Sequence, residues 1–261
     1  MNEVTGGAGK TGGERIAKVM ARAGLCSRRE AENWIAEGRV KVNGRLLASP
    51  AVTIGPEDRV VVDGKPIAAA EPPKLWRYHK PSGLLVSHGD PRGRPTVFER
   101  LPEELPRVVS VGRLDFNSEG LLLLTNDGGL ARHLELPATG WSRRYRVRVF
   151  GAPKPESLAK LADGITVEGV RYGPVTASVE RFQGDNAWLT FSFKEGKNRE
   201  VKRLCEHLGL KVNRLIRVSF GPFQLGDLVR GAVEEVPRRV LKQQLGKSFD
   251  LGEEPHAHRR R

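Results

Sequence analysis

Apolar residues recur at helical spacing mainly near the start of the chain. They fall at Ile16, Val19, Met20 and Ala23, and then at Ala31, Trp34 and Ile35. Ser27 stands three residues before Glu30, which is the pattern of a capping box, and Gly38 follows the second set as a stop signal. Apolar and charged residues then alternate up to Asn43-Gly44, a turn that favours a hairpin. This pattern predicts two short helices and a small sheet within residues 14–68.

The larger part of the chain, residues 74–246, has few helical periods and many short apolar runs. The runs are Leu84–Val86, Leu121–Leu124, Tyr145–Phe150, Ala187–Phe193 and Leu215–Phe220. Their spacing predicts a mostly antiparallel, mixed sheet with peripheral helices, so that the fold class is α+β. Residues 69–73 join the two regions with alanine, a charge and a proline pair, which is typical of a semi-rigid linker.

Both ends of the chain differ in composition from these two regions. Residues 1–13 are rich in glycine and lack an apolar run, so we expect neither fixed structure nor a secretory signal there. Residues 247–261 end in three arginines and are expected to form a solvated basic tail. No run approaches the roughly 18 apolar residues of a membrane span. Cys26 and Cys205 form no CxxC pair, which favours a reducing compartment, and hence the cytoplasm.

The net charge of +13 indicates a polyanionic partner. Nucleic acid fits this charge better than an acidic membrane surface, because no basic amphipathic helix stands out. Charge alone does not separate DNA from RNA.

One carboxylate lies directly ahead of the most apolar run. Asp115 follows Arg113 on a segment that leads into Leu121–Leu124, and the Asn126-Asp127-Gly128 turn signal closes that run. Four consecutive leucines predict a short strand buried on both faces, and a loop on such a rigid strand is a common place for function. The alternative is an ordinary loop in which Asp115 only caps a turn.

These residues resemble the catalytic signature of the bacterial rRNA pseudouridine synthases of the RsuA-like branch. The similarity lies in Gly112-Arg113-Leu114-Asp115, Ser118, Gly120 and the strand that ends in Thr125-Asn126-Asp127-Gly128. His79-Lys80-Pro81-Ser82-Gly83 also resembles the family's Lys-Pro-x-Gly motif, with His79 where asparagine is more usual. The resemblance implies that Asp115 is the catalytic aspartate, acting as nucleophile or base, and that Arg113 helps to flip the target base out of its stack.

A basic strand carries a candidate for stacking on that base. In Arg143–Val149, alternation places Tyr145, Val147 and Val149 on one face and three arginines on the other. One face then meets a core or a site, and the other is suited to phosphate. A strand tyrosine is often only a core residue. The family resemblance assigns Tyr145 the stacking role.

A second basic segment starts at Glu195-Gly196 and leads into a predicted helix. It resembles the family's third motif, which implies that Lys202 pairs with the catalytic aspartate and that Val201 packs under the base. An adjacent cation keeps a carboxylate ionised where water is excluded. The other basic or polar residues of the segment, expected to contact RNA, are Lys197, Asn198, Arg199 and Arg203. Cys205 and His207 alone are too few for a zinc site. The reaction of this family needs no metal or cofactor.

The smaller region resembles the S4 RNA-binding domain, with its related αL-like fold, in the order of its helices and hairpin. The residues expected to contact RNA there are Arg28, Arg29, Arg39 and Lys41. The competing interpretation is a merely solvated charged face.

Together these features predict a monomeric isomerase that converts uridine to pseudouridine in ribosomal RNA. Within the branch, Arg144–Gly151 and Gly196–Val201 look closest to the enzymes of the large subunit, which act on 23S rRNA. An enzyme for 16S rRNA is the alternative, and a non-catalytic S4-containing assembly factor is the rival from another class. The sequence leaves open whether Asp115 attacks C1′, attacks the uracil ring or removes a sugar proton.

Overall fold

The computed structural model describes residues 13–252, so the expectations for residues 1–12 and 253–261 lie outside the described residues. Contacts divide the chain into two compact units. Within the described residues the first covers 13–72, 106–108 and 252, and the second is built from residues 73–105 and 109–251. The division at Pro72 falls inside the segment expected to be a linker.

The first unit contains the two expected helices and small sheets. Its elements are β1 (Glu14–Arg15), α1 (Ile16–Arg22), α2 (Arg28–Ala36), β2 (Val40–Val42), β3 (Arg45–Leu46), β4 (Thr53–Ile54), β5 (Val60–Val62) and β6 (Lys65–Pro66). Ser27 and Glu30 form the capping box of α2, and Asn43 and Gly44 make the turn between β2 and β3 with positive φ. The four-stranded sheet has the order β3-β2-β5-β6 and shares one apolar core with both helices.

The second unit follows the expected α+β pattern. Its first elements are β7 (Leu75–Lys80), η1 (Phe98–Arg100), β8 (Val109–Val111), β9 (Glu119–Thr125), α3 (Gly128–Glu135), η2 (Pro137–Thr139) and β10 (Arg143–Phe150). The next are α4 (Pro155–Ala159), η3 (Lys160–Asp163), β11 (Ile165–Val167), β12 (Val170–Tyr172), β13 (Thr176–Gln183) and β14 (Asn186–Phe193). The last are α5 (Glu200–His207), β15 (Lys211–Phe220), β16 (Phe223–Gln224), β17 (Val233–Glu235) and α6 (Arg238–Leu245).

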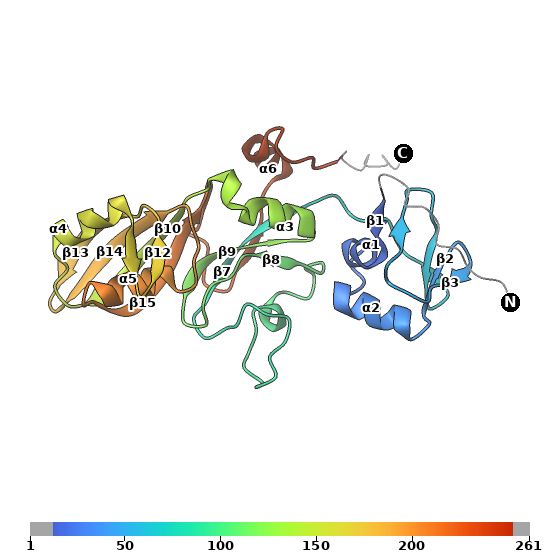
Figure 1. The fold of residues 1–261 in the computed structure, drawn as a ribbon, viewed down its shortest axis with the longest axis horizontal. Helices are drawn as coiled ribbons and strands as arrows, with labels where there is room; N and C mark the ends of the chain where they lie inside the picture. Colours follow the sequence, from blue (N-terminus) through green and yellow to red (C-terminus); the bar gives the residue numbers. More distant parts are fainter. Residues whose placement is uncertain (1–12, 253–261) are drawn as a thin grey trace. The chain divides into compact units, whose positions relative to one another are not determined.

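One large sheet organises this unit (Figure 1). Its strand order is β13-β14-β10-β15-β9-β7-β17, with β8 beside β9 and β16 beside β15. Among the ladders of the described strands, only β9–β15 is parallel, and it is held by the pairs Ile216↔Glu119 and Arg217↔Gly120. This short parallel contact is called the seam below, because it joins two halves of the sheet that have separate cores.

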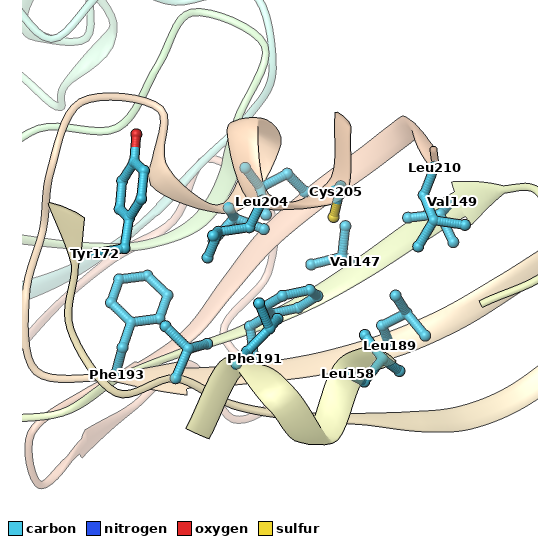
Figure 2. Close-up of a cluster of buried hydrophobic side chains, with 14 of the residues drawn as sticks. Val147, Val149, Leu158, Tyr172, Leu189, Phe191, Phe193, Leu204, Cys205 and Leu210 are labelled. Carbon is cyan, nitrogen blue, oxygen red and sulfur yellow. The ribbon is translucent and has the colours of Figure 1, made fainter. Parts of the chain in front are cut away.

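Each half of the sheet packs on its own apolar cluster. On the β13-β14-β10 side, Val147, Leu189, Phe191 and Leu204 belong to a cluster that α4 and α5 help to close (Figure 2). On the β9-β7 side, a second cluster is formed by Leu75, Leu121 and Leu123 with α3 and α6. The sheet therefore carries two cores, with the seam between them.

Three details of the sequence interpretation were wrong. Leu84–Val86 is not a strand: only an isolated bridge from Leu85 to Thr96 forms there, and the segment runs in a loop. Asn126-Asp127-Gly128 closes the leucine strand as expected, but it leads directly into α3, which the Asp127 side chain caps, instead of forming a separate turn. The basic tail was expected from residue 247, yet Phe249 packs on the second core and Leu251 is buried in it. Apolar residues at these two positions extend the packed unit past the expected boundary.

No helix within residues 13–252 is long and apolar enough to cross a membrane.

Candidate active site

Asp115 lies on a short loop between β8 and β9 that is fixed at several points. All residues of β9 are buried, as the run of leucines predicts. At the start of the loop, Gly112 adopts a positive φ and its N–H donates to Glu135 Oε1 at 2.6 Å. At the other end, the N–H of Ser118 donates to the Asp115 carbonyl at 3.0 Å. The loop is therefore a rigid support for the Asp115 carboxylate.

Lys80 fixes the backbone of the same loop through hydrogen bonds. The sequence interpretation missed this role. Its side chain is fully buried, and Nζ donates within 3.2 Å to the carbonyl oxygens of Pro81, Asp115, Phe116 and Ser118. Burial lowers the pKa of Lys80 to about 8, although the charges of Asp115 and Glu119 oppose this shift. A signal was present in the sequence, because Lys80 alternates with Trp76 and Tyr78 on one side of β7.

Lys202 meets the Asp115 side chain from α5. Its Nζ donates to Asp115 Oδ2 at 2.9 Å, with 16% of the lysine side chain and 35% of the aspartate side chain exposed. Val201 and Leu204 pack α5 into the first core and so fix the direction of Lys202. An ion pair that is partly open to solvent contributes modestly to stability. Its main effect is to place a cation directly beside the carboxylate.

Tyr145 comes to this site from β10. Its ring stacks on Phe193 of the neighbouring strand, with centroids 5.4 Å apart and the ring planes within 6° of parallel. The ring is only half-buried, so part of it remains open to solvent. Stacked aromatics of this kind are a suitable surface for a flat base.

A single cleft of about 1020 Å³ brings these residues together. Asp115, Tyr145, Lys202 and the exposed Arg113 all line it. The other lining residues that bear on the argument below are Arg143, Lys197, Asn198, Arg199, Glu200, Val201, Arg217 and Phe220. Of the basic segment expected to contact RNA, only Arg203 does not line the cleft.

Lys197 and Arg199 already have partners within the protein. Lys197 Nζ pairs with Glu195 at 2.8 Å and donates to the Arg171 carbonyl. Arg199 sits in the left-handed region at the start of α5 and lies 3.9 Å from Glu206. Both side chains are exposed and can exchange these contacts for a ligand.

Buried charges form the floor of the cleft, and the sequence interpretation did not single them out. Arg143 and Arg217 lie over the ring of Phe220, with Cζ 4.6 and 5.2 Å from its centroid. Glu200 accepts a hydrogen bond from the Lys197 N–H at 2.9 Å. Burial raises the pKa of Glu200 to about 7. Alternation was again a usable signal, since Arg143 shares the side of β10 that carries Tyr145.

The seam fixes the distance between the two halves of the site. A side chain at Gly120 would lie 2.3 Å from the Arg217 carbonyl oxygen, so only glycine allows the strands to approach this closely. Glu119 accepts from Arg214 at 2.9 and 3.0 Å and from Arg230 at 3.0 Å. Burial acts to raise the pKa of Glu119, but the arginines outweigh it and the pKa lies below its usual value.

The basic residues expected to bind RNA in the first unit are not equivalent. Arg28 and Arg29, in the first turn of α2, and Lys41 on β2 are exposed. Arg39 instead pairs with Asp63 at 2.7 Å and Glu37 at 3.1 Å, and it lies over the Trp34 ring. This arginine is therefore held by contacts within the unit.

Nothing in residues 13–252 gathers three or more histidine, cysteine, aspartate or glutamate side chains in a geometry that could hold a metal ion.

Comparison with known protein families agrees with this geometry. Residues 74–207 match the family model described as RNA pseudouridylate synthase, and residues 14–60 match the S4 domain. An RNA pseudouridine synthase of Rickettsia felis is 45% identical over 231 residues, which cover 88% of this chain and 100% of the relative.

Further relatives carry a more specific name. The ribosomal large subunit pseudouridine synthase B of Pseudomonas aeruginosa is 42% identical over 247 residues, covering 90% of this chain and 63% of the relative. The protein of the same name from Salmonella typhi is 42% identical and covers 85% of this chain and 79% of the relative.

A solved structure supports the fold as well. The crystal structure of a pseudouridylate synthase superposes with a TM-score of 0.62 at 27% identity, over 89% of this chain and 99% of the other. The chain therefore belongs to the RNA pseudouridylate synthase family, whose members are isomerases, and it carries an S4 domain ahead of the matched catalytic region.

Proposed function

We propose that the chain isomerises a specific uridine in the RNA of the large ribosomal subunit, 23S rRNA, and that Asp115 is the catalytic residue. The observation that carries this proposal is the 2.9 Å contact between Asp115 and Lys202 in the cleft that Tyr145 also lines. The choice of ribosomal RNA rests on the names of the relatives from Pseudomonas and Salmonella.

The reaction makes limited demands on the protein. The bond from C1′ to N1 of uridine breaks, the base rotates, and a bond from C1′ to C5 forms, with no gain or loss of atoms. One ionised carboxylate can serve as nucleophile or base for these steps. Asp115 is in a suitable position, because Lys80 fixes its backbone and Lys202 supplies a countercharge to its side chain.

The target base must leave its stack before it can react, at a cost of a few kcal/mol. In the proposal, the base stacks on Tyr145, with Val201 beside it, and Arg113 occupies the vacated space in the RNA. The exposure of Arg113 at the mouth of the cleft and the half-exposed ring of Tyr145 support these roles.

Further RNA contacts, away from the target base, offset that cost. We propose that Arg28, Arg29 and Lys41 of the first unit bind phosphates, together with the exposed residues Lys197, Asn198 and Arg199. Arg39 and Arg203 are weaker candidates, since Arg39 is paired internally and Arg203 does not line the cleft. Deletion of residues 1–73 tests this: affinity for RNA should fall, and a truncated chain that binds as tightly as the full chain would contradict it.

Mapping of pseudouridines tests the proposed substrate. Ribosomal RNA from cells with and without the gene should differ at one site in 23S rRNA, and the wild-type gene but not Asp115→Asn should restore it. A difference confined to 16S rRNA would instead identify the small-subunit enzyme. No difference in either RNA, with purified protein that still binds ribosomal particles, would favour the assembly factor.

The cytoplasmic location and the monomeric state stay predictions. Light scattering tests the monomeric state.

A further inference from the structure

Strand β10 presents arginines on the side of the sheet opposite to Tyr145. Its pairing with β14 is regular over eight residues, so alternation places Arg144, Arg146, Arg148 and Phe150 on one side. Arg148 pairs in register with Trp188 on β14 and with Arg214 on β15, and Trp188 pairs with Arg181 on β13. We call the residues Arg144, Arg146, Arg148, Arg181 and Arg214 the arginine face.

This side of the sheet is open. The five arginines are exposed or half-buried, whereas Val147 and Val149, which point the other way, are fully buried in the first core. Phe150, at the end of the row, leaves 51% of its surface exposed. An exposed aromatic beside a row of cations is common where proteins meet single-stranded or looped RNA.

Positive charge exceeds negative charge on this surface. Glu180 pairs with Arg146, and Glu119 pairs with Arg214 and Arg230. The arginine face and Arg230 thus place six cations against two carboxylates, an excess of four. Arg144, Arg148 and Arg181 form no ion pair with any carboxylate in the described part of the chain, and Arg148 Nε has no hydrogen-bond partner there.

Two members of the arginine face, Arg146 and Arg214, are held by ion pairs before any ligand arrives. Arg146 makes two hydrogen bonds of 2.6 Å to Glu180, and its Cζ lies 4.5 Å from the centroid of the Trp188 ring. Neighbouring strands in a sheet lie about 4.8 Å apart, so the backbone positions of Arg148 and Arg214 are one strand spacing apart. Arg181 lies two strands from Arg148, with β14 between them. Arginine forks of this kind recognise phosphate, and prior ordering reduces the entropy lost on binding.

We propose that the arginine face is a second RNA-binding surface, which contacts the phosphate backbone of the substrate at a distance from the target uridine. Because it lies on the other side of the sheet from the Asp115 cleft, a short RNA that fills the cleft does not reach it. A long, folded RNA passes around the edge of the sheet and engages both surfaces. The inference rests on the proposed function only for the choice of a ribosomal RNA as the probe.

The test compares two triple variants of the full chain that lose the same charge. The first is Arg144→Gln, Arg148→Gln and Arg181→Gln. The control is Lys154→Gln, Lys160→Gln and Lys242→Gln, at exposed positions just before α4, on η3 and on α6 that belong to neither surface. Each is assayed with two RNAs, a stem-loop around the mapped uridine and the whole ribosomal RNA domain that contains it.

The first variant should bind the long RNA at least about tenfold more weakly, and its slope of log K against log salt should fall by about two to three, since each lost phosphate contact removes 0.7–0.9. Its affinity and turnover on the stem-loop should match the control. Equal loss on both RNAs, or unchanged affinity for the long RNA, would overturn the proposal. Unchanged affinity for the long RNA would favour an acidic protein as the partner of the arginine face.

A crosslink locates the contact independently of affinity. Cys26 and Cys205 are both buried, so Phe150→Cys offers one accessible thiol for a photoreactive group within residues 13–252. Crosslinks should appear in the long RNA, away from the target uridine, and their absence would contradict the proposal. Crosslinking without pseudouridine formation would instead contradict the proposed function and leave the surface in place.

Discussion

The two halves of the large sheet contribute differently to the site. The half built on β7, β8 and β9 supplies Asp115 from a loop that Lys80 and Glu135 hold by its backbone. The half built on β10, β14 and α5 supplies Tyr145 and Lys202, whose side chains line the cleft beside it. One half therefore fixes the proposed catalytic carboxylate, and the other places a cation and an aromatic ring beside it.

The seam brings the side chains of the two halves together in one site. Only two residue pairs join β9 to β15 in parallel, supported by Arg217 Nε donating to the Leu121 carbonyl at 2.7 Å and by Arg214 bound to Glu119. Neither half by itself brings Asp115 together with Tyr145 and Lys202. The geometry of the candidate site therefore depends on the seam between the two cores as much as on the cores themselves.

The largest expected effect comes from removing the charge of the Asp115 carboxylate. Asp115→Asn should lower turnover at least about a thousandfold, because an amide keeps the shape of the carboxylate but is neither nucleophile nor base. RNA affinity should stay within a few-fold of wild type. Pseudouridine formation in a purified assay measures the first quantity and a binding titration the second. Turnover close to wild type would show that Asp115 is not the catalytic residue.

A substitution at Gly120 should disrupt the seam between β9 and β15. Its φ is 101°, and the new Cβ of Gly120→Ala would collide with the Arg217 backbone. Strain and overpacking together should lower the free energy of unfolding by about 3 kcal/mol and reduce turnover as well. Gly209→Ala is the control, because Gly209 also has a positive φ but has open space around it. Similar denaturation curves for the two variants would show that the close approach at the seam is not needed.

Lys202→Met tests the contribution of the second half to the charge at Asp115. Turnover should fall on the order of a hundredfold, as when one electrostatic partner of a reacting group is removed, while affinity changes little. Lys202→Arg should recover part of the activity. Lys211→Met, at an exposed position on β15, should act mainly on affinity. If both methionine variants only weaken binding and keep full turnover at saturation, Lys202 is merely a phosphate contact.

The last prediction concerns the buried carboxyl group of Glu200 and the pH dependence of stability. Because the pKa of Glu200 is raised from 4.5 to about 7, its contribution to stability is complete below pH 4.5 and is lost as the pH rises through 7. Glu200→Gln removes this dependence. The variant should therefore gain stability relative to wild type as the pH rises through that range, by about 1.4 kcal/mol for each pH unit between the two pKa values. Chemical denaturation at several pH values measures it, with the exposed Glu206→Gln as control. A difference that does not change with pH would be inconsistent with this assignment.

Much of the fold was predictable because local signals agreed with the final structure. The capping box of Ser27 and Glu30, the Asn43-Gly44 turn and the buried leucine strand depend on neighbouring residues alone. The failures arose where a local pattern was ambiguous. Leu84–Val86 is apolar enough for a strand, but it lacks a partner strand in the large sheet and runs in a loop.

The candidate site shows the same division. Motif resemblance was sufficient to select Asp115, Tyr145, Lys202 and Arg113, and the structure places all four on one cleft. It gave no role to Lys80, because an isolated lysine in a sequence is usually solvated. Only the folded chain shows four carbonyl oxygens around its ammonium group.

The sequence by itself therefore determined the elements, their apolar faces and the chemical types at the site, since periodicity, caps and turns act over a few residues. The tertiary structure alone decided which charges are used internally. Arg39 is taken up by Asp63 and Glu37, while Arg148 is left without an ionic partner in the described chain. It also decided that Asp115 and Lys202, 87 positions apart, come within 2.9 Å. Such pairings depend on strand order and on the close contact at Gly120, and long-range packing rather than local pattern sets both.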